Sequence, residues 1–291
     1  MSDRIHVRMA YVVLHYNSIE ETRACVRSIQ QTAAFPDSAV VVVDNASPNG
    51  TGKTLKEEYN SVPSVEVILN DVNAGFSRGN NIGWWYVRDR YDADFVTVCN
   101  NDVTFPSADY VERVERAYSE SPFEVLGPDV FQTTLGIHQS PLGLSAPDEK
   151  AVRRTIRLNA LAKRFFSLFW LVFGRGELRR IQTRGDSMDQ WNTPMRDVPL
   201  MGACLVFSRR FVAEREKAFE PETFLYYEEY LLWHACMKRR YRMAYRPEIQ
   251  VLHNEGRATS SEARSERDRY RRMVGNTLDA AKVYLEELKR A

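Results

Sequence analysis

Four short apolar segments alternate with helix-forming segments in the first 120 residues, and this alternation limits the fold more than any other feature of the sequence. The apolar segments are residues 9–16, 40–43, 65–69 and 94–99. They are rich in β-branched and aromatic residues, which is typical of buried strands. Strands that alternate with helices form parallel sheets, because each connection crosses back over the sheet. The sequence therefore predicts an α/β fold with a Rossmann-like, mostly parallel central sheet flanked by helices.

The segments between these strands carry the usual signals of helices. The expected helices are residues 17–31, 51–60, 73–89 and 106–119. The last is expected to begin at Pro106, which suits the first turn of a helix. In the third expected helix, Gly75, Gly79 and Gly83 recur every four residues, so one face of the helix has no side chains at these positions and another surface can approach it closely. The first strand is not followed by GxGxxG, which disfavours a dinucleotide fold of the dehydrogenase type.

The second half of the chain continues the pattern less regularly. Strands are expected at 125–131, 198–208 with a break at Gly202-Ala203, 243–245 and 249–252, and a loop at 132–150. Helices are expected from Glu228 to about residue 240 and from about residue 261 onward. The last helix is amphipathic, with an apolar stripe of Val274, Leu278, Ala281, Leu285 and Leu288.

Composition and charge exclude several classes of protein. The chain has 291 residues, 44% hydrophobic and 27% charged, and its formal net charge of +1 disfavours a general nucleic-acid binder. Cys25, Cys99, Cys204 and Cys236 lack the paired spacing of a disulfide framework or a zinc site, so we expect reduced cysteines and a cytoplasmic protein. The longest near-continuous apolar stretch, residues 165–173, is much shorter than the ~20 residues of a membrane-spanning helix. The amino terminus has no apolar core of signal-peptide length.

Polar side chains at the ends of strands are the first candidate site residues, because ligands bind at the carboxyl ends of strands in open α/β sheets. Asn100 and Asp102 close the fourth strand, and on extended chain two such residues point the same way. One carboxylate suits a Mg²⁺ or Mn²⁺ ion that also binds phosphate oxygens of its ligand. The alternative is an Asx turn that caps the next helix. His253, at another strand end, is a candidate metal ligand or a core-edge histidine.

Three further positions each have a functional and a structural interpretation. Asp44, with Asn45 beside it, follows the second strand, where it can accept hydrogen bonds from a base or a ribose, or only from its own loop. Arg78, in the glycine-rich segment, is a candidate for contact with a base or phosphate, or an ordinary surface arginine. The adjacent acids Glu228 and Glu229 can supply a general base or can stabilise the start of a helix.

The order of these motifs resembles family 2 glycosyltransferases, and more narrowly their bacterial rhamnosyltransferase and galactofuranosyltransferase-like branch. In the first half the resemblance rests on YVVLHYN, VVVVDNASPNGT, NDVNAGFSRGNNIG and VCNNDV. In the second half it rests on VPLMGACLVFSRR, FLYYEEYLLWHACMKRRYRMAYRP and VLHNEG. It covers residues 9–131 and 197–256, and it implies a GT-A fold.

The resemblance implies an inverting, metal-dependent glycosyltransferase of cell-surface polysaccharide biosynthesis. Such an enzyme moves a sugar from a nucleotide-diphosphate donor, here a dTDP- or UDP-sugar, to a glycan or lipid-linked glycan acceptor. A single GT-A domain is then divided into a nucleotide-sugar-binding half at 1–131, a loop and helical insertion at 132–196, an acceptor-binding and catalytic half at 197–260 and a C-terminal helix at 261–291.

The resemblance also implies a role for each candidate residue. The substrate-binding set is Asp44, Asn45, Arg78, Asn100, Asn101 and Gly202. Asp102 would ligate Mg²⁺ or Mn²⁺, and His253 would complete the metal–diphosphate site. Glu229 would take the proton from the acceptor hydroxyl, with Glu228 as the other candidate base.

Two departures from the family's pattern limit which residue roles the resemblance can supply. Glu229 stands where the family has Asp, and Leu231 replaces a later acidic residue. The alternative is therefore a non-catalytic relative that binds a nucleotide sugar or a partner transferase. A nucleotidyltransferase is disfavoured, because the first loop lacks the glycine-rich, basic sequence that such an enzyme needs.

Residues 153–181 differ in character from the rest, with eight basic side chains against one acid, Glu177. On one helical wheel Arg153, Arg157 and Arg164 lie opposite an apolar side made by Leu158, Leu161, Phe165, Phe169 and Val172. Residues 153–181 could contact either of two surfaces. One is an anionic membrane surface, which would place the protein on the inner face of the cell membrane. The other is the protein's own core or a second subunit in a homodimer.

Overall fold

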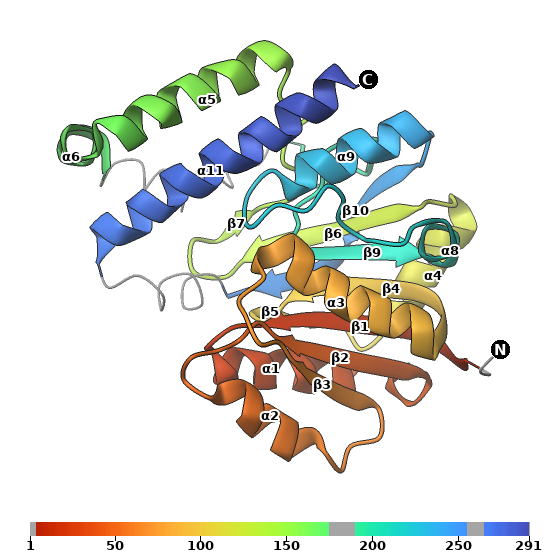
Figure 1. Ribbon diagram of the computed structural model, residues 1–291. Helices are drawn as coiled ribbons and strands as arrows, with labels where there is room; N and C mark the ends of the chain where they lie inside the picture. Colours follow the sequence, from red (N-terminus) through yellow and green to blue (C-terminus); the bar gives the residue numbers. More distant parts are fainter. Residues whose placement is uncertain (1–3, 175–189, 255–264, 291) are drawn as a thin grey trace.

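The computed structural model describes residues 4–174, 190–254 and 265–290. One curled mixed sheet runs through the molecule, with helices on both faces (Figure 1). In the described residues the strand order is β3-β2-β1-β4-β9-β6-β10-β5, with β7 beside β6 and β8 beside β10. The strands are β1 Ile5–His15, β2 Ser38–Asp44, β3 Val65–Leu69, β4 Tyr91–Asn100, β5 Val103–Thr104, β6 Val125–Gln132, β7 Ile137–His138, β8 Met195–Arg196, β9 Cys204–Ser208 and β10 Met243–His253. Most paired residues belong to parallel pairings, so the predicted fold class is confirmed.

The helices alternate with the strands in the first half, as predicted. They are α1 Ile19–Gln30, α2 Thr51–Tyr59, α3 Gly75–Arg90, α4 Tyr110–Glu120, α5 Glu149–Arg164, α6 Phe166–Phe169, α8 Arg209–Glu214, α9 Glu228–Arg239 and α11 Glu266–Lys289, with a 3-10 turn η1 Phe35–Asp37 and a π turn η2 Trp170–Gly174. The predicted start of α4 at Pro106 is wrong. The carbonyl of Ala108 accepts a hydrogen bond from the Ala33 N–H, and the helix begins at Tyr110, four residues after Pro106.

Two predictions for the second half are also wrong in detail. The strand expected from residue 198 begins only at Cys204, because residues 199–201 bond to the loop around Ser140 through Pro199 and Met201. The two short strands expected at 243–245 and 249–252 are one strand, β10, whose register shifts between Arg246 and Gln250. The predicted loop at 132–150 is interrupted by the short strand β7.

Two apolar cores lie on the two faces of the sheet, and the run of four valines in β2 explains why both are needed. Val40 and Val42 belong to the core under α1 and α4, whereas Val41 and Val43 belong to the core under α3, α8 and α9. Successive side chains of a strand point to opposite faces, so a strand covered on both faces is apolar throughout.

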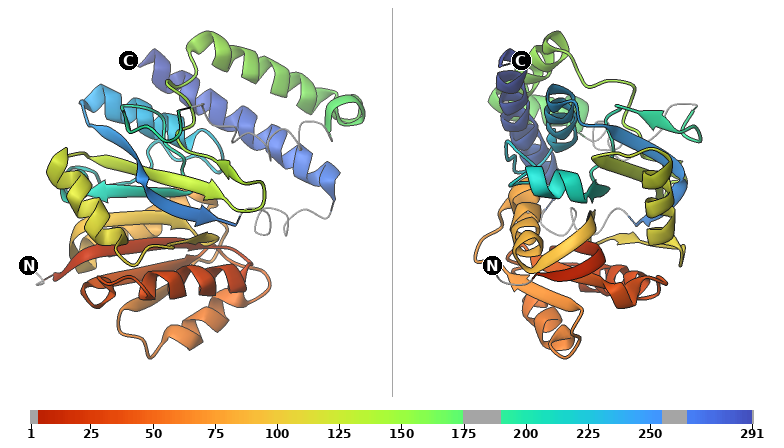
Figure 2. Two further views of the ribbon diagram at one scale, coloured as in Figure 1. Left: turned by 180° about the vertical axis from the view of Figure 1, so that it is seen from behind. Right: turned by 90° about the vertical axis from the view of Figure 1, so that its right-hand side faces the viewer.

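Helices α5 and α11 lie side by side and antiparallel at one edge of the molecule, beyond α9 (Figures 1 and 2). The predicted stripe of α11 is confirmed: Val274, Leu278, Ala281 and Leu285 are buried, and Leu288 packs beside them. The predicted apolar side of 153–181 is only partly right. The chain bends at Phe165, so one helical wheel does not describe it, and Leu158 and Leu161 are about half exposed. Residues 175–181 lie outside the described residues.

The helices of the described residues include none that is long and apolar enough to cross a membrane. Cys25, Cys99, Cys204 and Cys236 are all buried thiols without a disulfide.

Candidate functional site

The carboxyl ends of β1 and β2 lie side by side, because their parallel register pairs His15 with Asp44. Asp44 is buried, and its Oδ1 accepts hydrogen bonds from the hydroxyl of Ser47 at 2.5 Å and from the Ser47 N–H at 3.2 Å. Burial raises the pKa of the Asp44 carboxyl, and the bonds from Ser47 oppose that rise. A side chain on Gly52 would collide with this carboxyl, so the start of α2 lies directly against it.

His15 lies behind Asp44 as a buried, neutral ring. Its Nδ1 is 2.6 Å from Thr22 Oγ1 and its Nε2 is 3.0 Å from Thr51 Oγ1. Burial lowers its pKa to about 4. Nε2 is 3.9 Å from Asp44 Oδ1, so the two form no ion pair at neutral pH. The sequence analysis missed His15, although its position as the last residue of a strand was an available signal.

Asn45 holds the start of α3 in place. Its Oδ1 accepts a hydrogen bond from the Ala74 N–H at 2.8 Å, and its Nδ2 donates to Asn73 Oδ1 at 3.0 Å and to the Gly75 carbonyl at 3.1 Å. Arg78 follows in the first turn of α3 and is exposed. Asn45 therefore acts within the protein, whereas Arg78 is open to a ligand.

The glycine face of α3 makes the close approach that the sequence predicts. A Cβ on Gly79 would lie 2.7 Å from Leu14 Cδ1, and a Cβ on Gly83 would collide with Val12 of the same strand. Gly75 has φ +76° and lies against the backbone of Phe224. The carbonyl of Phe224 also accepts a hydrogen bond from the Phe76 N–H at 2.6 Å. The start of α3 thus joins the first half of the chain to the segment before α9.

The polar residues at the end of β4 have different partners. Asn100 is half-buried, and its N–H donates to the carbonyl of Ala203 at 2.9 Å. Asn101 is buried, and its Nδ2 donates to the Ser18 carbonyl at 3.2 Å and to Thr22 Oγ1 at 2.9 Å. Asp102 lies in a turn after the strand. The strand alternation used to align Asn100 with Asp102 therefore does not apply, since β4 ends at Asn100.

Asp102 and His253 lie together, as the sequence predicts for a metal pair. Strand β10 runs antiparallel to β5 with His253 opposite Val103, and the Asn254 N–H donates to the Asp102 carbonyl at 2.9 Å. The His253 Nε2 is 3.2 Å from Asp102 Oδ1. Both side chains are buried.

Gln139 completes this pair and was missed by the sequence analysis, because it lies in a loop without a recognisable motif. Its Oε1 is 2.7 Å from His253 Nδ1. The amide oxygen of Gln139 is an acceptor, so this contact suits the neutral tautomer with the proton on Nδ1, in which Nε2, the nitrogen next to Asp102, can bind a metal ion.

The chemistry of this pair fits a divalent cation. Asp102 Oδ1 is buried and accepts no hydrogen bond from the described part of the chain. An unprotonated imidazole nitrogen and a carboxylate oxygen are both metal ligands. No group of three or more His, Cys, Asp or Glu side chains forms a metal site in the described residues. Further ligands would therefore be water or oxygens of a bound diphosphate.

Glu228 and Glu229 begin α9, and they differ in environment. Glu228 is buried, its Oε2 accepts no hydrogen bond from the described residues, and Thr223 donates to the carboxyl. Burial, and next the negative charge of Glu229, hold the pKa of Glu228 well above its usual value. Glu229 is half-buried and lies against Gly202, where a Cβ would be 3.1 Å from its Oε1.

The backbone before this pair is strained. Tyr226 and Tyr227 have φ values of 73° and 66°, in the left-handed region that bulky residues rarely adopt. Strain of this kind is held by its surroundings and gathers at functional sites. Tyr227 is the residue that precedes the first turn of α9. The strained pair therefore sets the direction in which Glu228 and Glu229 leave the chain.

Residues far apart in the sequence meet around the end of β4. Asp102 follows Asn100, Asn100 bonds to Ala203, and Gly202 contacts the carboxyl of Glu229. The pair suited to a cation and the pair suited to a proton acceptor thus belong to one connected region.

A scan against protein families matches residues 11–197 to the family described as Glycosyl transferase family 2. The match covers more than half of the chain. The protein belongs to glycosyltransferase family 2. A search of curated proteins gives no match.

Solved structures of another protein share the fold of this family 2 chain. The crystal structure of S. aureus TarS 1-349 aligns with a TM-score of 0.52 and 13% identity, over 85% of this chain and 60% of that one. The same TarS fragment in complex with UDP-GlcNAc gives 0.54 and 14%, over 88% and 61%. Its complex with UDP gives 0.54 and 13%, over 86% and 61%. This family 2 chain spans about three fifths of the TarS fragment, and at this identity the likeness establishes the fold.

Proposed function

We propose that this protein is an inverting glycosyltransferase that moves a hexose from a nucleoside diphosphate to a hydroxyl of a glycan or lipid-linked glycan. Membership of family 2 supports sugar transfer. The observation that carries the proposal is how the end of β4 is joined to the start of α9: Asp102 lies two residues after Asn100, the Asn100 N–H bonds to the Ala203 carbonyl, and the adjacent Gly202 lies against Glu229. It joins a group suited to a diphosphate-bound cation with a group suited to remove a proton.

The donor is proposed to bind the first half of the chain, residues 1–131. Asp44 would accept hydrogen bonds from the base or ribose, Arg78 would reach the base or phosphate, and Asn100 would lie beside the ribose or diphosphate. The TarS fragment binds UDP-GlcNAc and UDP, which supports a UDP- or dTDP-sugar here. The motif Asn-Asn-Asp at 100–102 supports the rhamnosyltransferase and galactofuranosyltransferase-like branch.

Asp102 and His253 would hold a Mg²⁺ or Mn²⁺ ion, and Gln139 would keep the His253 ring in the metal-binding tautomer. Bound there, a divalent cation supplies positive charge next to the departing diphosphate. The burial of both ligands keeps water away and strengthens that attraction.

Glu229 is proposed as the general base. Burial, and next the charge of Glu229, raise the pKa of Glu228, so the half-buried Glu229 is the member of the pair better suited to be ionised. Gly202 lets the Glu229 carboxyl lie against the backbone, where its position is fixed. The acceptor hydroxyl gives its proton to Glu229 as its oxygen attacks the anomeric carbon, and the bond from that carbon to the diphosphate oxygen breaks.

The surroundings of Leu231 disfavour an acidic residue at this position. Leu231 is buried among Val152 of α5 and Ala281 and Tyr284 of α11. A carboxylate there would be buried without water. The acceptor side of this protein is therefore proposed to be formed by residues 197–260 together with α5 and α11, and not by a polar residue at 231.

Donor turnover tests the proposed function. Wild-type protein with Mn²⁺ should hydrolyse or transfer from one member of a panel of UDP- and dTDP-sugars, and Asp102→Ala should abolish the reaction. A thermal-shift panel with the same donors identifies binding, because a ligand of the folded state raises its stability. A stabilising donor that is never turned over would identify the non-catalytic alternative.

A further inference from the structure

Helices α5 and α6 with η2 present an apolar surface that α11 leaves uncovered. We call it the apolar flank: Leu158, Leu161, Phe165, Leu168, Leu171, Val172 and Phe173. It holds most of the exposed large apolar side chains of the described residues. The exposed fraction runs from 46% at Leu161 to 82% at Leu171. The opposite side of the same segment packs against α11, where Ala162 is buried with Tyr270 and Met273.

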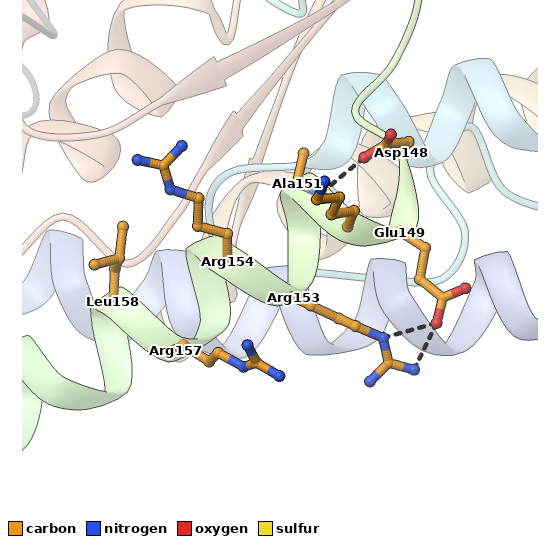
Figure 3. Close-up of a pocket in the computed structure, with 8 residues that line it drawn as sticks. Asp148, Glu149, Ala151, Arg153, Arg154, Arg157 and Leu158 are labelled. Atoms are coloured by element: carbon orange, nitrogen blue, oxygen red, sulfur yellow. Dashed lines mark hydrogen bonds and ion pairs between the residues drawn. The ribbon is translucent and has the colours of Figure 1, made fainter.

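Arginines lie on the helix that carries the apolar flank and on α11 beside it. On α5, Arg154 extends from the same side as Leu158 (Figure 3). On α11, the guanidinium groups of Arg267 and Arg271 lie 5.6 and 4.5 Å from the ring centre of Phe166.

Basic side chains outnumber acidic ones beside the apolar flank, because the start of α11 adds Glu266 and Asp268 but also Arg267, Arg269, Arg271 and Arg272. Residues 149–174 contain one acid, Glu149, which pairs with Arg153. Arg157 and Arg164 are exposed on α5 as well. The surroundings of the apolar flank are therefore strongly cationic, although the chain as a whole has a net charge of only +1.

We propose that the apolar flank docks on an anionic lipid bilayer. Leu and Phe side chains enter the boundary between headgroups and acyl chains, while the arginines stay at the level of the phosphates. A second copy of the chain is a poorer partner for the apolar flank than a bilayer is. A two-fold contact through this face would bring Arg154 and Arg157 of one copy close to the same residues of the other.

The bilayer contact also orients the site. Figure 1 shows α6 at the end of the molecule toward which β1 runs, where the candidate site residues lie. This placement, which rests on the proposed function, presents the site to an acceptor carried by a lipid in the same bilayer. The docking itself is independent of turnover.

Vesicle co-sedimentation tests the docking. The probes are vesicles of phosphatidylcholine alone and of phosphatidylcholine with phosphatidylglycerol, at low and high salt. Wild-type protein should pellet with the anionic vesicles at low salt. Leu168→Ser/Leu171→Ser should lose most of that binding, and Arg154→Glu/Arg157→Glu should lower the partition coefficient at least about tenfold.

The controls match each change on another surface. Leu144→Ser alters a leucine that is 68% exposed, and Lys53→Glu/Lys56→Glu makes the same charge change on α2. Both should bind as wild type does. Equal pelleting of all variants, or no dependence on anionic lipid, would overturn the proposal. So would a dimer in sedimentation velocity that Leu168→Ser/Leu171→Ser dissociates without any vesicle binding. Hydrolysis of a soluble donor by the same samples tests the proposed function separately.

Discussion

The backbone of Gly202 lies against the carboxyl of Glu229, so close that a Cβ at residue 202 would be 3.1 Å from Oε1 and 3.2 Å from Cγ. The two residues come from a loop before β9 and from the first turn of α9. This contact fixes the proposed base relative to the end of β4, because the neighbouring Ala203 carbonyl binds the Asn100 N–H.

Gly202→Ala is expected to lower kcat about tenfold, because the carboxyl of Glu229 must move by a few tenths of an ångström and catalysis depends steeply on such placement. Donor affinity in a thermal-shift titration should stay unchanged. Gly275→Ala is the control, since nothing lies within 4 Å of a Cβ there. Unchanged kcat in Gly202→Ala would show that this contact does not position the base.

Asp102→Asn and His253→Gln are expected to remove the Mn²⁺-dependent part of nucleotide binding, because each takes away one of two proposed metal ligands. Isothermal titration of UDP with Mn²⁺ or with EDTA measures it. Asp71→Asn, at an exposed position, is the control. Equal UDP affinity with Mn²⁺ and with EDTA in the wild type would remove the metal from the proposal.

Gln139→Leu is expected to weaken Mn²⁺ binding about 10- to 100-fold, because His253 Nδ1 loses the acceptor that fixes its tautomer. Gln139→Glu keeps an oxygen acceptor and should retain most of the affinity. Manganese titration followed by electron paramagnetic resonance measures the free ion directly. Similar losses in both variants would indicate a packing role only.

Glu229→Gln should lower kcat by about 10²- to 10⁴-fold while the donor Kd is retained, because it removes the proposed proton acceptor. Glu228→Gln should have a much smaller effect, since the raised pKa of Glu228 already favours its neutral form. Single-turnover rates separate chemistry from product release. The reverse order of the two losses would make Glu228 the base.

The stability of the fold should fall between pH 6.5 and about pH 4 because of His15, whose pKa burial lowers from 6.5 to about 4. In that window the unfolded chain binds a proton that the folded ring does not, so the free energy of unfolding rises with pH and is lost on acidification. The loss reaches about 3 kcal/mol at the acid end.

Urea unfolding of His15→Gln across the same pH range isolates this effect. The variant should lose less stability on acidification than the wild type. His6→Gln, with an exposed ring, should behave as the wild type does. Parallel pH profiles for wild type and His15→Gln would contradict the lowered pKa.

The strand–helix alternation of the first half was predictable from the sequence because its signals are local. Four valines in a row require a strand buried on both faces, and β3 occupies the predicted residues 65–69. The Gly75, Gly79 and Gly83 spacing also predicts a helix face without side chains, which then packs on β1 and on the segment at Phe224. Motif order further singled out Asp102, His253 and Glu229 as candidate site residues.

The partners of those residues were decided by tertiary structure alone. Gln139 has no motif, and it meets His253 only because β7 turns back along β6, which is paired with β10. Gly202 meets Glu229 because the loop before β9 passes the start of α9. The exposed side of α5 was likewise set by α11 and by the bend at Phe165, not by a helical wheel.

Sequence by itself determined the elements, the family and the chemical types at the site, since hydrophobic period, turn residues and motif order are properties of short stretches of chain. Only the tertiary structure decided which carboxyl is buried, which nitrogen of His253 faces Asp102 and which apolar side chains stay exposed. Burial and hydrogen-bond geometry depend on contacts between residues distant in sequence, and these exist only once the sheet has brought them together.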